Sequence, residues 1–269
     1  MSKPLIPAQR RERIQAYLAS HKIVATSDLC ELLDVSEATI RRDLEWLEHE
    51  GVVERTHGGA ILSQQLNSEQ EYQQREQRYP EEKRAIGALA ASLIEDGDIV
   101  FINSGTTSTQ IIRHIRYELD ATIITNNLFS TLEVGEVGYE LILLGGEFQP
   151  KSNSVGGRFA MDNLSQIYAD KVFFGVDGIS PKYGCTVPTS TEAEVMRYMI
   201  ERTTGPVSVV TDHSKWGVVS NFEVATISQV HRLIIDEGLD KSACESIADL
   251  PIEILLATIN ARQAYHALD

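Results

Sequence analysis

The chain has 269 residues, of which 42% are hydrophobic and 23% charged, and its formal net charge is −15. At ~150 residues per domain this length predicts two domains, and no apolar run approaches the ~20 residues that cross a bilayer, so we expect a cytoplasmic protein without a membrane partner. The three cysteines, Cys30, Cys185 and Cys244, lie far apart and form no CxxC motif. We therefore expect neither a disulfide framework nor a metal site.

The acidity of the chain is unevenly distributed. Residues 1–60 contain 8 Lys and Arg against 10 Asp and Glu, a net of −2, while the other 209 residues contain 16 against 29, a net of −13. A strongly acidic protein is not a typical nucleic-acid binder. This objection applies to the second part of the chain, and the first sixty residues remain compatible with DNA.

The first sixty residues carry the pattern of a helix-turn-helix followed by a hairpin. Apolar residues recur at helical spacing in three stretches, 10–22, 26–35 and 37–50. The second helix is expected to close near Asp34, and the break of about three residues before the third, "DVS", is the spacing of a helix-turn-helix whose second helix enters the major groove. The following "GVVERTHGGAIL" predicts two short strands joined by a turn, a wing beside the helices.

Several polar side chains of this segment are candidates for DNA contact. Ser36 can cap the third helix, and turning ~100° per residue places Ala38 and Arg42 opposite its apolar stripe, with Arg41 on the flank. The candidate DNA-binding residues are Ser36, Ala38, Thr39, Arg41, Arg42, Arg55 and His57. The alternative from the pattern alone is a pair of helices whose arginines merely form surface ion pairs.

Residues 35–60, "VSEATIRRDLEWLEHEGVVERTHGGA", resemble the DNA-binding signature of the DeoR family of bacterial transcriptional regulators. The resemblance implies a winged helix-turn-helix domain over residues 1–62 that binds double-stranded operator DNA. We expect a homo-oligomer, a dimer or a tetramer, because one small head seldom supplies enough contacts for a specific site.

Residues 63–80 are predicted to form a polar linker. The stretch "SQQLNSEQEYQQREQRY" is rich in Gln and Glu and nearly free of aliphatic residues, so it buries little by itself. Two alternatives remain open, a disordered segment or a helix that docks on a partner subunit.

Residues 81–257 predict a mostly parallel, Rossmann-like α/β effector domain, because short apolar runs alternate with helical stretches. Residues 258–269 form a tail to which we assign no role. The candidate strands are "DIVFIN", "ATIIT", "ELILL", "KVFFGV", "VSVVT", "HRLII" and "IEILLA".

Polar residues follow five of these strands, where ligands bind in such folds. The segment "SGTTST", residues 104–109, offers hydroxyls and the N–H groups of a helix start to a phosphate, and the other residues suit sugar hydroxyls or a charge. The candidate effector-binding residues are Ser104, Gly105, Thr106, Thr107, Ser108, Asn126, Gly145, Gly146, Asp177 and Lys215. For any one of them the alternative is ordinary turn chemistry or capping.

The same segments, among them "INSGTTS", "GVDGI" and "VVTDHSKWG", resemble the DeoR-family effector domain, which is similar in turn to ribose-5-phosphate isomerase. The resemblance implies a repressor of a carbohydrate-utilisation operon, controlled by a phosphorylated sugar or polyol, without a cofactor.

The alternative is a sugar-phosphate isomerase fused to a DNA-binding head. The isomerase pattern is Asp-Gly-Ala-Asp-Glu, whereas residues 177–180 here read Asp-Gly-Ile-Ser and lack two acidic positions. Glu192 and Glu194 remain as bases, or are merely acidic residues in the first turn of a helix. We therefore expect no enzymatic activity. A scaffolding protein with a degenerate site, which binds neither operator DNA nor phosphosugar, is the third class.

Overall fold

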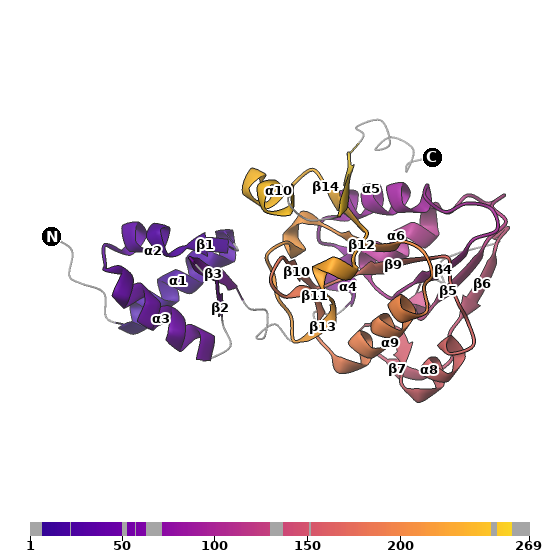
Figure 1. Ribbon diagram of the computed structural model, residues 1–269, viewed down its shortest axis with the longest axis horizontal. Coiled ribbons are helices and arrows are strands. Elements are labelled where there is room, and N and C mark those ends of the chain that lie inside the picture. Colours follow the sequence, from indigo (N-terminus) through magenta and orange to yellow (C-terminus); the bar gives the residue numbers. More distant parts are fainter. Residues whose placement is uncertain are drawn as a thin grey trace.

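The computed structural model describes residues 7–21, 23–49, 53–56, 58–62, 72–129, 137–150, 152–248 and 252–259. Figure 1 shows a small N-terminal domain and a larger α/β domain, and each has buried apolar clusters of its own. None of the helices in these ranges is long and apolar enough to span a membrane.

The N-terminal domain is a winged helix-turn-helix, as predicted. Its helices are α1 (Pro7–His21), α2 (Thr26–Leu33) and α3 (Glu37–His49), and its antiparallel sheet has the order β1 (Ile23–Ala25), β3 (Gly59–Leu62), β2 (Val53–Arg55). Apolar side chains of all three helices form one core, including Ile14, Leu29 and Ile40. Asp34 adopts a left-handed conformation, with φ 51°, and turns the chain from α2 into α3.

Strand β1 is absent from the sequence-based prediction. It pairs with the wing strand β3, with Val24 opposite Ala60, and so attaches the wing to the helices. Three residues are too few to show the alternation of apolar and polar side chains that marks a strand.

The larger domain is built on a seven-stranded parallel sheet, and its strands lie at the seven predicted positions. The spatial order is β15-β14-β12-β9-β4-β5-β6. The strands are β4 (Ile99–Ile102), β5 (Thr122–Thr125), β6 (Glu140–Leu143), β9 (Lys171–Gly175), β12 (Val207–Thr211), β14 (Arg232–Asp236) and β15 (Glu253–Ala257).

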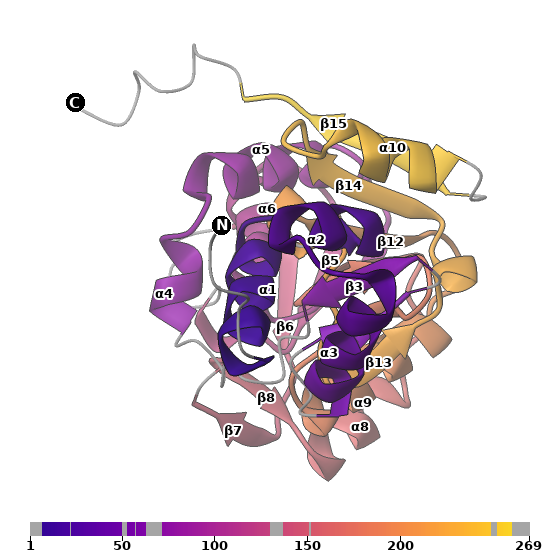
Figure 2. The same cartoon turned by 90° about the vertical axis from the view of Figure 1, so that its left-hand side faces the viewer.

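Helices cover both faces of this sheet. Figures 1 and 2 show α5 (Pro80–Ala91) and α6 (Thr106–His114) on one side and α8 (Arg158–Leu164) and α9 (Ser190–Glu201) on the other. Neighbouring residues of one strand therefore join different cores, as Phe101 and Ile102 do. Because both faces are buried, the strands read as continuous apolar runs.

The described residues of this domain also form smaller elements. The sheet β10-β11-β13 and the hairpin β7–β8 are antiparallel, and α10 (Lys241–Ala248) precedes the edge strand β15. Two short 3₁₀ helices span His213–Lys215 and Ile227–Gln229. The remaining strands are β7 (Glu147–Gln149), β8 (Ser154–Gly156), β10 (Gly178–Ser180), β11 (Gly184–Val187) and β13 (Phe222–Ala225).

The structure differs from the expected linker over its second half. Residues Tyr72–Glu76 form a helix, α4, which packs on α6 of the same chain. The Tyr72 side chain is buried, its hydroxyl lies 2.5 Å from Thr109 Oγ1, and Glu76 pairs with Arg113 at 3.0 Å. The buried ring of Tyr72 and this ion pair help to attach a segment whose composition alone suggests no docking. The first half, residues 63–71, lies outside the described residues.

Candidate ligand pocket and DNA-binding surface

The strand order creates a crevice between β4 and β9. From β4 the chain proceeds outward to β5 and β6, and it then returns to β9 on the other side of β4 and continues to β12, β14 and β15. The loops after β4 and β9 therefore leave the sheet in opposite directions. Ligands of open α/β sheets bind at such a switch point, beyond the carboxyl ends of the strands.

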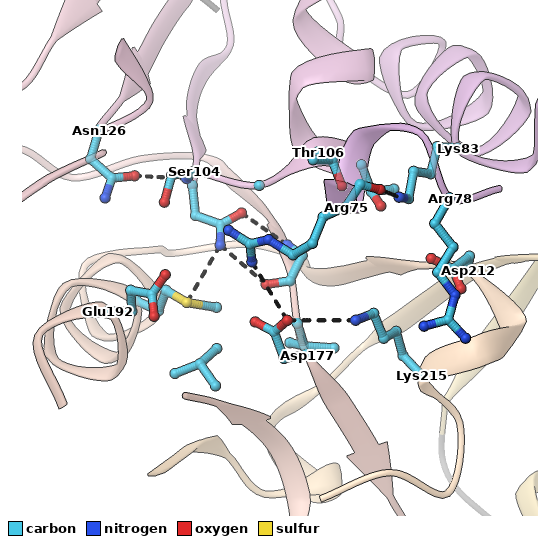
Figure 3. Close-up of a pocket in the computed structure, with 17 residues that line it drawn as sticks. Arg75, Arg78, Lys83, Ser104, Thr106, Asn126, Asp177, Glu192, Asp212 and Lys215 are labelled. Atoms are coloured by element: carbon cyan, nitrogen blue, oxygen red, sulfur yellow. Dashed lines mark hydrogen bonds and ion pairs between the residues drawn. The ribbon is translucent and has the colours of Figure 1, made fainter. Parts of the chain in front are cut away.

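A pocket occupies this crevice, and Figure 3 shows its polar lining. Seven of the ten predicted effector-binding residues line it: Ser104, Gly105, Thr106, Thr107, Asn126, Asp177 and Lys215. They come together because they follow four neighbouring parallel strands. Further lining residues are Arg75, Arg78, Lys83, Glu192 and Asp212.

Residues 104–107 form the entry into α6. Gly105 is the N-cap residue, with φ 156° and ψ 153°, a conformation that glycine adopts readily. Asn126 Oδ1 accepts the N–H of Ser104 at 2.8 Å and so holds the loop against β5. The N–H groups of Thr106 and Thr107 belong to the first turn, which has no intrahelical acceptors. Donors at a helix start favour an anion.

Three predicted residues do not line the pocket. The Ser108 hydroxyl is fully buried, donates to Asn103 Oδ1 at 2.6 Å and accepts the N–H of Gly175. It therefore supports residues 104–107 from their buried side. Gly145 and Gly146 are exposed. A Cβ atom at Gly146 would lie 2.5 Å from the carbonyl oxygen of Gly156, so this glycine permits the close approach of the β7–β8 hairpin.

Three cations of the pocket lie outside the predicted set. Arg75 and Arg78 come from α4 and the turn after it, and Lys83 from the first turns of α5. All three precede the first strand of the sheet, so a search of strand ends misses them. Their charge was the available signal, since three cations within nine residues stand out in an acidic domain.

The carboxylate of Asp177 lies between two cations of the pocket, Arg75 and Lys215. Its Oδ1 is 3.5 Å from Arg75 Nη1 and 3.5 Å from Lys215 Nζ. Burial opposes ionisation of the carboxyl group, but the charges of Lys215 and Arg75 prevail and hold the pKa of Asp177 below its ordinary range. Asp177 is therefore an internal counter-ion of the pocket.

Lys83 is buried, and its Nζ donates to the carbonyl oxygen of Arg75. Burial lowers the pKa of Lys83 to about 8; the carboxylate of Asp212 opposes this shift, and Lys215 and the two arginines add to it. The lining holds four cations, Arg75, Arg78, Lys83 and Lys215, against the three carboxylates of Asp177, Glu192 and Asp212. In addition, Arg75 Nε is buried and has no hydrogen-bond partner among the described residues. The arrangement can hold an anion.

The residues predicted as acid–base candidates for an isomerase occupy different surroundings. Ile179 is fully buried in the core, and Ser180 Oγ accepts the N–H of Tyr183. Glu192 lines the pocket, but its Oε2 accepts the hydroxyl of Thr189 at 2.8 Å and its N–H donates to that hydroxyl, which caps α9. Glu194 is exposed and does not line the pocket.

The N-terminal domain exposes the predicted DNA-binding residues of α3. Arg41 and Arg42 point away from the core, and Arg41 pairs with Glu37 at 2.7 Å. Both partners of this pair are about 60% exposed, with side-chain values of 63% and 60%. Exposed ion pairs of this kind contribute ~0–1 kcal/mol, so a DNA phosphate or nucleobase can replace Glu37 as the partner of Arg41 at little cost.

The other candidates lie at the start of α3 and in the wing. Ala38 is exposed, and the hydroxyls of Ser36 and Thr39 are 2.9 Å apart. Arg55 of β2 pairs with Glu45 of α3 at 3.0 Å. His57 lies outside the described residues.

Comparison with known proteins covers both domains. A family model described as the DeoR-like helix-turn-helix domain matches residues 10–65, and one described as the DeoR C-terminal sensor domain matches residues 78–237. The chain belongs to the DeoR family of transcriptional regulators. The predicted resemblance to this family is confirmed, and DeoR-family relatives match along nearly their whole length.

The chain is 36% identical to the HTH-type transcriptional repressor GlcR of Bacillus subtilis (strain 168), over 92% of this chain and 95% of the relative. It is 32% identical to a putative aga operon transcriptional repressor of Escherichia coli O157:H7, over 93% of each. Among solved structures, a ribose 5-phosphate isomerase from Methanocaldococcus jannaschii matches 50% of this chain and 53% of its own, at 16% identity and a TM-score of 0.37.

Proposed function

We propose that this DeoR-family regulator is a repressor of a carbohydrate-utilisation operon, and that a phosphorylated sugar or polyol in the pocket weakens its binding to operator DNA. The observation that carries the proposal is the cation-rich pocket at the start of α6, described above. Relatives named as repressors, one of them of the aga operon, support the regulatory role.

The phosphate group would lie at the start of α6. There it accepts the N–H groups of Thr106 and Thr107 and their hydroxyls, and Lys215 supplies a charge from the opposite side of the pocket. A hydrogen bond to a charged group contributes ~1.5–3 kcal/mol. Asn126 and Asp177 line the same pocket and offer an amide and a carboxylate to sugar hydroxyls.

Operator binding would use α3 in the major groove, with Arg41 and Arg42 as the side chains that reach bases and phosphates. Two or more copies of the chain would combine their heads on one operator, as a dimer or a tetramer. The ligand can weaken DNA binding only if it binds one arrangement of the DNA-binding domains more tightly than another, because equal affinity for both leaves the equilibrium between them unchanged.

The isomerase alternative is disfavoured by the carboxylates. Of the acidic candidates, Asp177 is paired with two cations, and the carboxylate of Glu192 accepts the hydroxyl of Thr189, the N-cap residue of α9. An aldose–ketose isomerase needs a carboxylate that is free to accept a proton. We propose that the purified protein shows no turnover of triose, pentose or hexose phosphates above background.

Thermal unfolding with a panel of phosphorylated sugars and polyols tests the proposal. A compound at ~100 times its dissociation constant should stabilise the folded protein by about 2.7 kcal/mol. The same compound should weaken operator binding in a fluorescence anisotropy titration. Lys215→Ala should lose the stabilisation, whereas Lys241→Ala, on the exposed face of α10, is the matched control. If no phosphorylated compound stabilises the wild type, the proposal is refuted.

A further inference from the structure

Helix α4 lies in the sequence between the two family domains, since the DNA-binding model ends at residue 65 and the sensor model begins at 78. In the structure α4 packs on α6, the helix that begins at the pocket. Every signal that passes along the chain from the pocket to the DNA-binding head must pass through this segment. Its contacts therefore bear on how the two domains can communicate.

One face of α4 is hydrogen-bonded to the pocket loop. Thr109 Oγ1 donates to the carbonyl oxygen of Gly105 at 2.9 Å, so the Tyr72 hydroxyl, 2.5 Å away, is the donor to Thr109. Asn127 Nδ2 also donates to Thr109 Oγ1, at 2.7 Å. A continuous chain of hydrogen bonds thus joins α4 to the residue that caps α6.

The other face of α4 supplies part of the pocket wall. Figure 3 shows Arg75 reaching toward Asp177, and Arg78 follows at the end of the same segment. The 3.5 Å distance to Asp177 exceeds the ~2.7–2.9 Å of a strong charge-assisted hydrogen bond, and Arg75 Nε has no partner among the described residues. Arg75 therefore has a donor, Nε, that no residue in the described part of the chain accepts.

The corner between α4 and α5 is held by tertiary contacts. Tyr79 has φ 54° and ψ 52°, a left-handed conformation that is unusual for a tyrosine before a proline. Its ring lies 4.7 Å from that of His213, whose Nδ1 is 2.7 Å from Asp236 Oδ2. The surroundings impose this conformation, so the direction of α4 depends on the packing around the pocket.

We infer that α4 is the element that couples the pocket to the DNA-binding head, with Arg75 and Arg78 as ligand-contacting residues. This inference rests on the proposed function. A phosphate in the pocket draws both arginines inward and holds α4 more firmly on α6, which restricts the positions open to the head. Coupling is reciprocal, so contacts that hold α4 in place also raise the affinity for the anion.

Hydrogen–deuterium exchange of residues 72–79 tests the inference, with inorganic phosphate as the probe and chloride at matched ionic strength as the reference. Phosphate should slow exchange in this segment of the full-length protein. Arg75→Gln should raise the dissociation constant for phosphate by about tenfold or more. When wild type and variant are compared at equal phosphate occupancy, phosphate should no longer slow hydrogen–deuterium exchange in residues 72–79 of this variant. Arg84→Gln, on the exposed face of α5 and outside the pocket, is the matched control and should behave as the wild type.

Tyr72→Phe tests the coupling role through the affinity for phosphate, a readout that a purely structural role of Tyr72 would not change. The substitution removes the hydrogen bond to Thr109 but keeps the ring, and Tyr72 does not line the pocket. Exchange in residues 72–79 should accelerate, and by reciprocity phosphate should bind several-fold more weakly. If phosphate stabilises the wild type but leaves this exchange unchanged, the coupling role is refuted and the proposed function stands. If phosphate does not bind at all, both are refuted.

Discussion

Replacing Asp177 with asparagine should raise the affinity for inorganic phosphate and lower the stability of the unliganded protein. Asp177 is the counter-ion of Arg75 and Lys215, and the side chains of all three are less than one fifth exposed, at 18%, 16% and 18%. An anion that enters the pocket competes with this carboxylate for the same two cations. Asparagine keeps the shape of the side chain and removes its charge.

The magnitudes follow from the two 3.5 Å distances. At an effective dielectric constant of ~20, each pair has a gross attraction of roughly 5 kcal/mol, most of which the cost of desolvating the charges cancels. Removing one partner of a largely buried pair typically costs ~3 kcal/mol, so the unliganded variant should unfold about 3 kcal/mol more easily. Phosphate should bind about tenfold more tightly, a change of ~1.4 kcal/mol.

Isothermal titration calorimetry with phosphate and chemical denaturation without it measure the two effects. Asp162→Asn is the matched control, because Asp162 is an exposed carboxylate on α8 that pairs with Arg158 at 3.8 Å, outside the pocket. Stability should fall and phosphate affinity should rise in the same variant. If Asp177→Asn binds phosphate as weakly as the wild type or more weakly, Asp177 does not compete with the anion and the reasoning fails.

Three further predictions concern the head, the titration of the pocket and the response to ligand. Arg41→Ala and Arg42→Ala should each weaken specific operator binding by ~1–3 kcal/mol in footprinting titrations while leaving thermal stability unchanged. If both variants protect operator DNA as the wild type does, α3 does not bind in the major groove. Lys83 loses its charge as the pH rises through about 8, so phosphate affinity should fall above this pH in the wild type and stay constant in Lys83→Arg, as measured by calorimetry. Thr107→Ala and Lys215→Ala should need roughly tenfold more ligand to release operator DNA, yet still bind DNA without ligand, and anisotropy titrations that show normal release would contradict this.

The sign of the Lys83 prediction follows from its lowered pKa. In the unfolded chain the lysine titrates near its ordinary value of 10.5, whereas in the folded protein it titrates near 8. The contribution of Lys83 to the free energy of unfolding is therefore present above about pH 10.5 and is lost as the pH falls through 8, because the folded protein must then bury the charged ammonium group. A bound phosphate offsets this charge, so ligand binding and protonation of Lys83 favour each other.

Much of the fold was predictable because the sheet is parallel and buried on both faces. Runs such as "IVFI" and "VSVVT" consist mainly of apolar residues without the alternation of a half-exposed strand, and each corresponds to one strand, here β4 and β12. The strands β10, β11 and β13 were not predicted. They are three or four residues long, and their pairing joins residues as distant as Cys185 and Ala225. Local periodicity contains no information on such contacts.

The candidate site was predictable where topology alone brings residues together. Thr106, Asn126, Asp177 and Lys215 follow parallel strands, and parallel strands end at the same edge. Arg75 and the other cations of α4 and α5 could not be found in this way. Arg75 reaches the pocket because α4 folds back on α6, where the hydroxyl of Tyr72 is hydrogen-bonded to Thr109.

The ion pairs of Asp177 also support the proposal that the pocket binds a ligand without turning it over. A carboxylate that removes a proton from carbon near neutral pH works best when its pKa approaches the operating pH. The charges of Lys215 and Arg75 shift the pKa of Asp177 in the opposite direction. The same two pairs hold the side chains of Arg75 and Lys215 beside Asp177 in the pocket wall. The geometry that makes Asp177 an effective counter-ion therefore makes it a poor base.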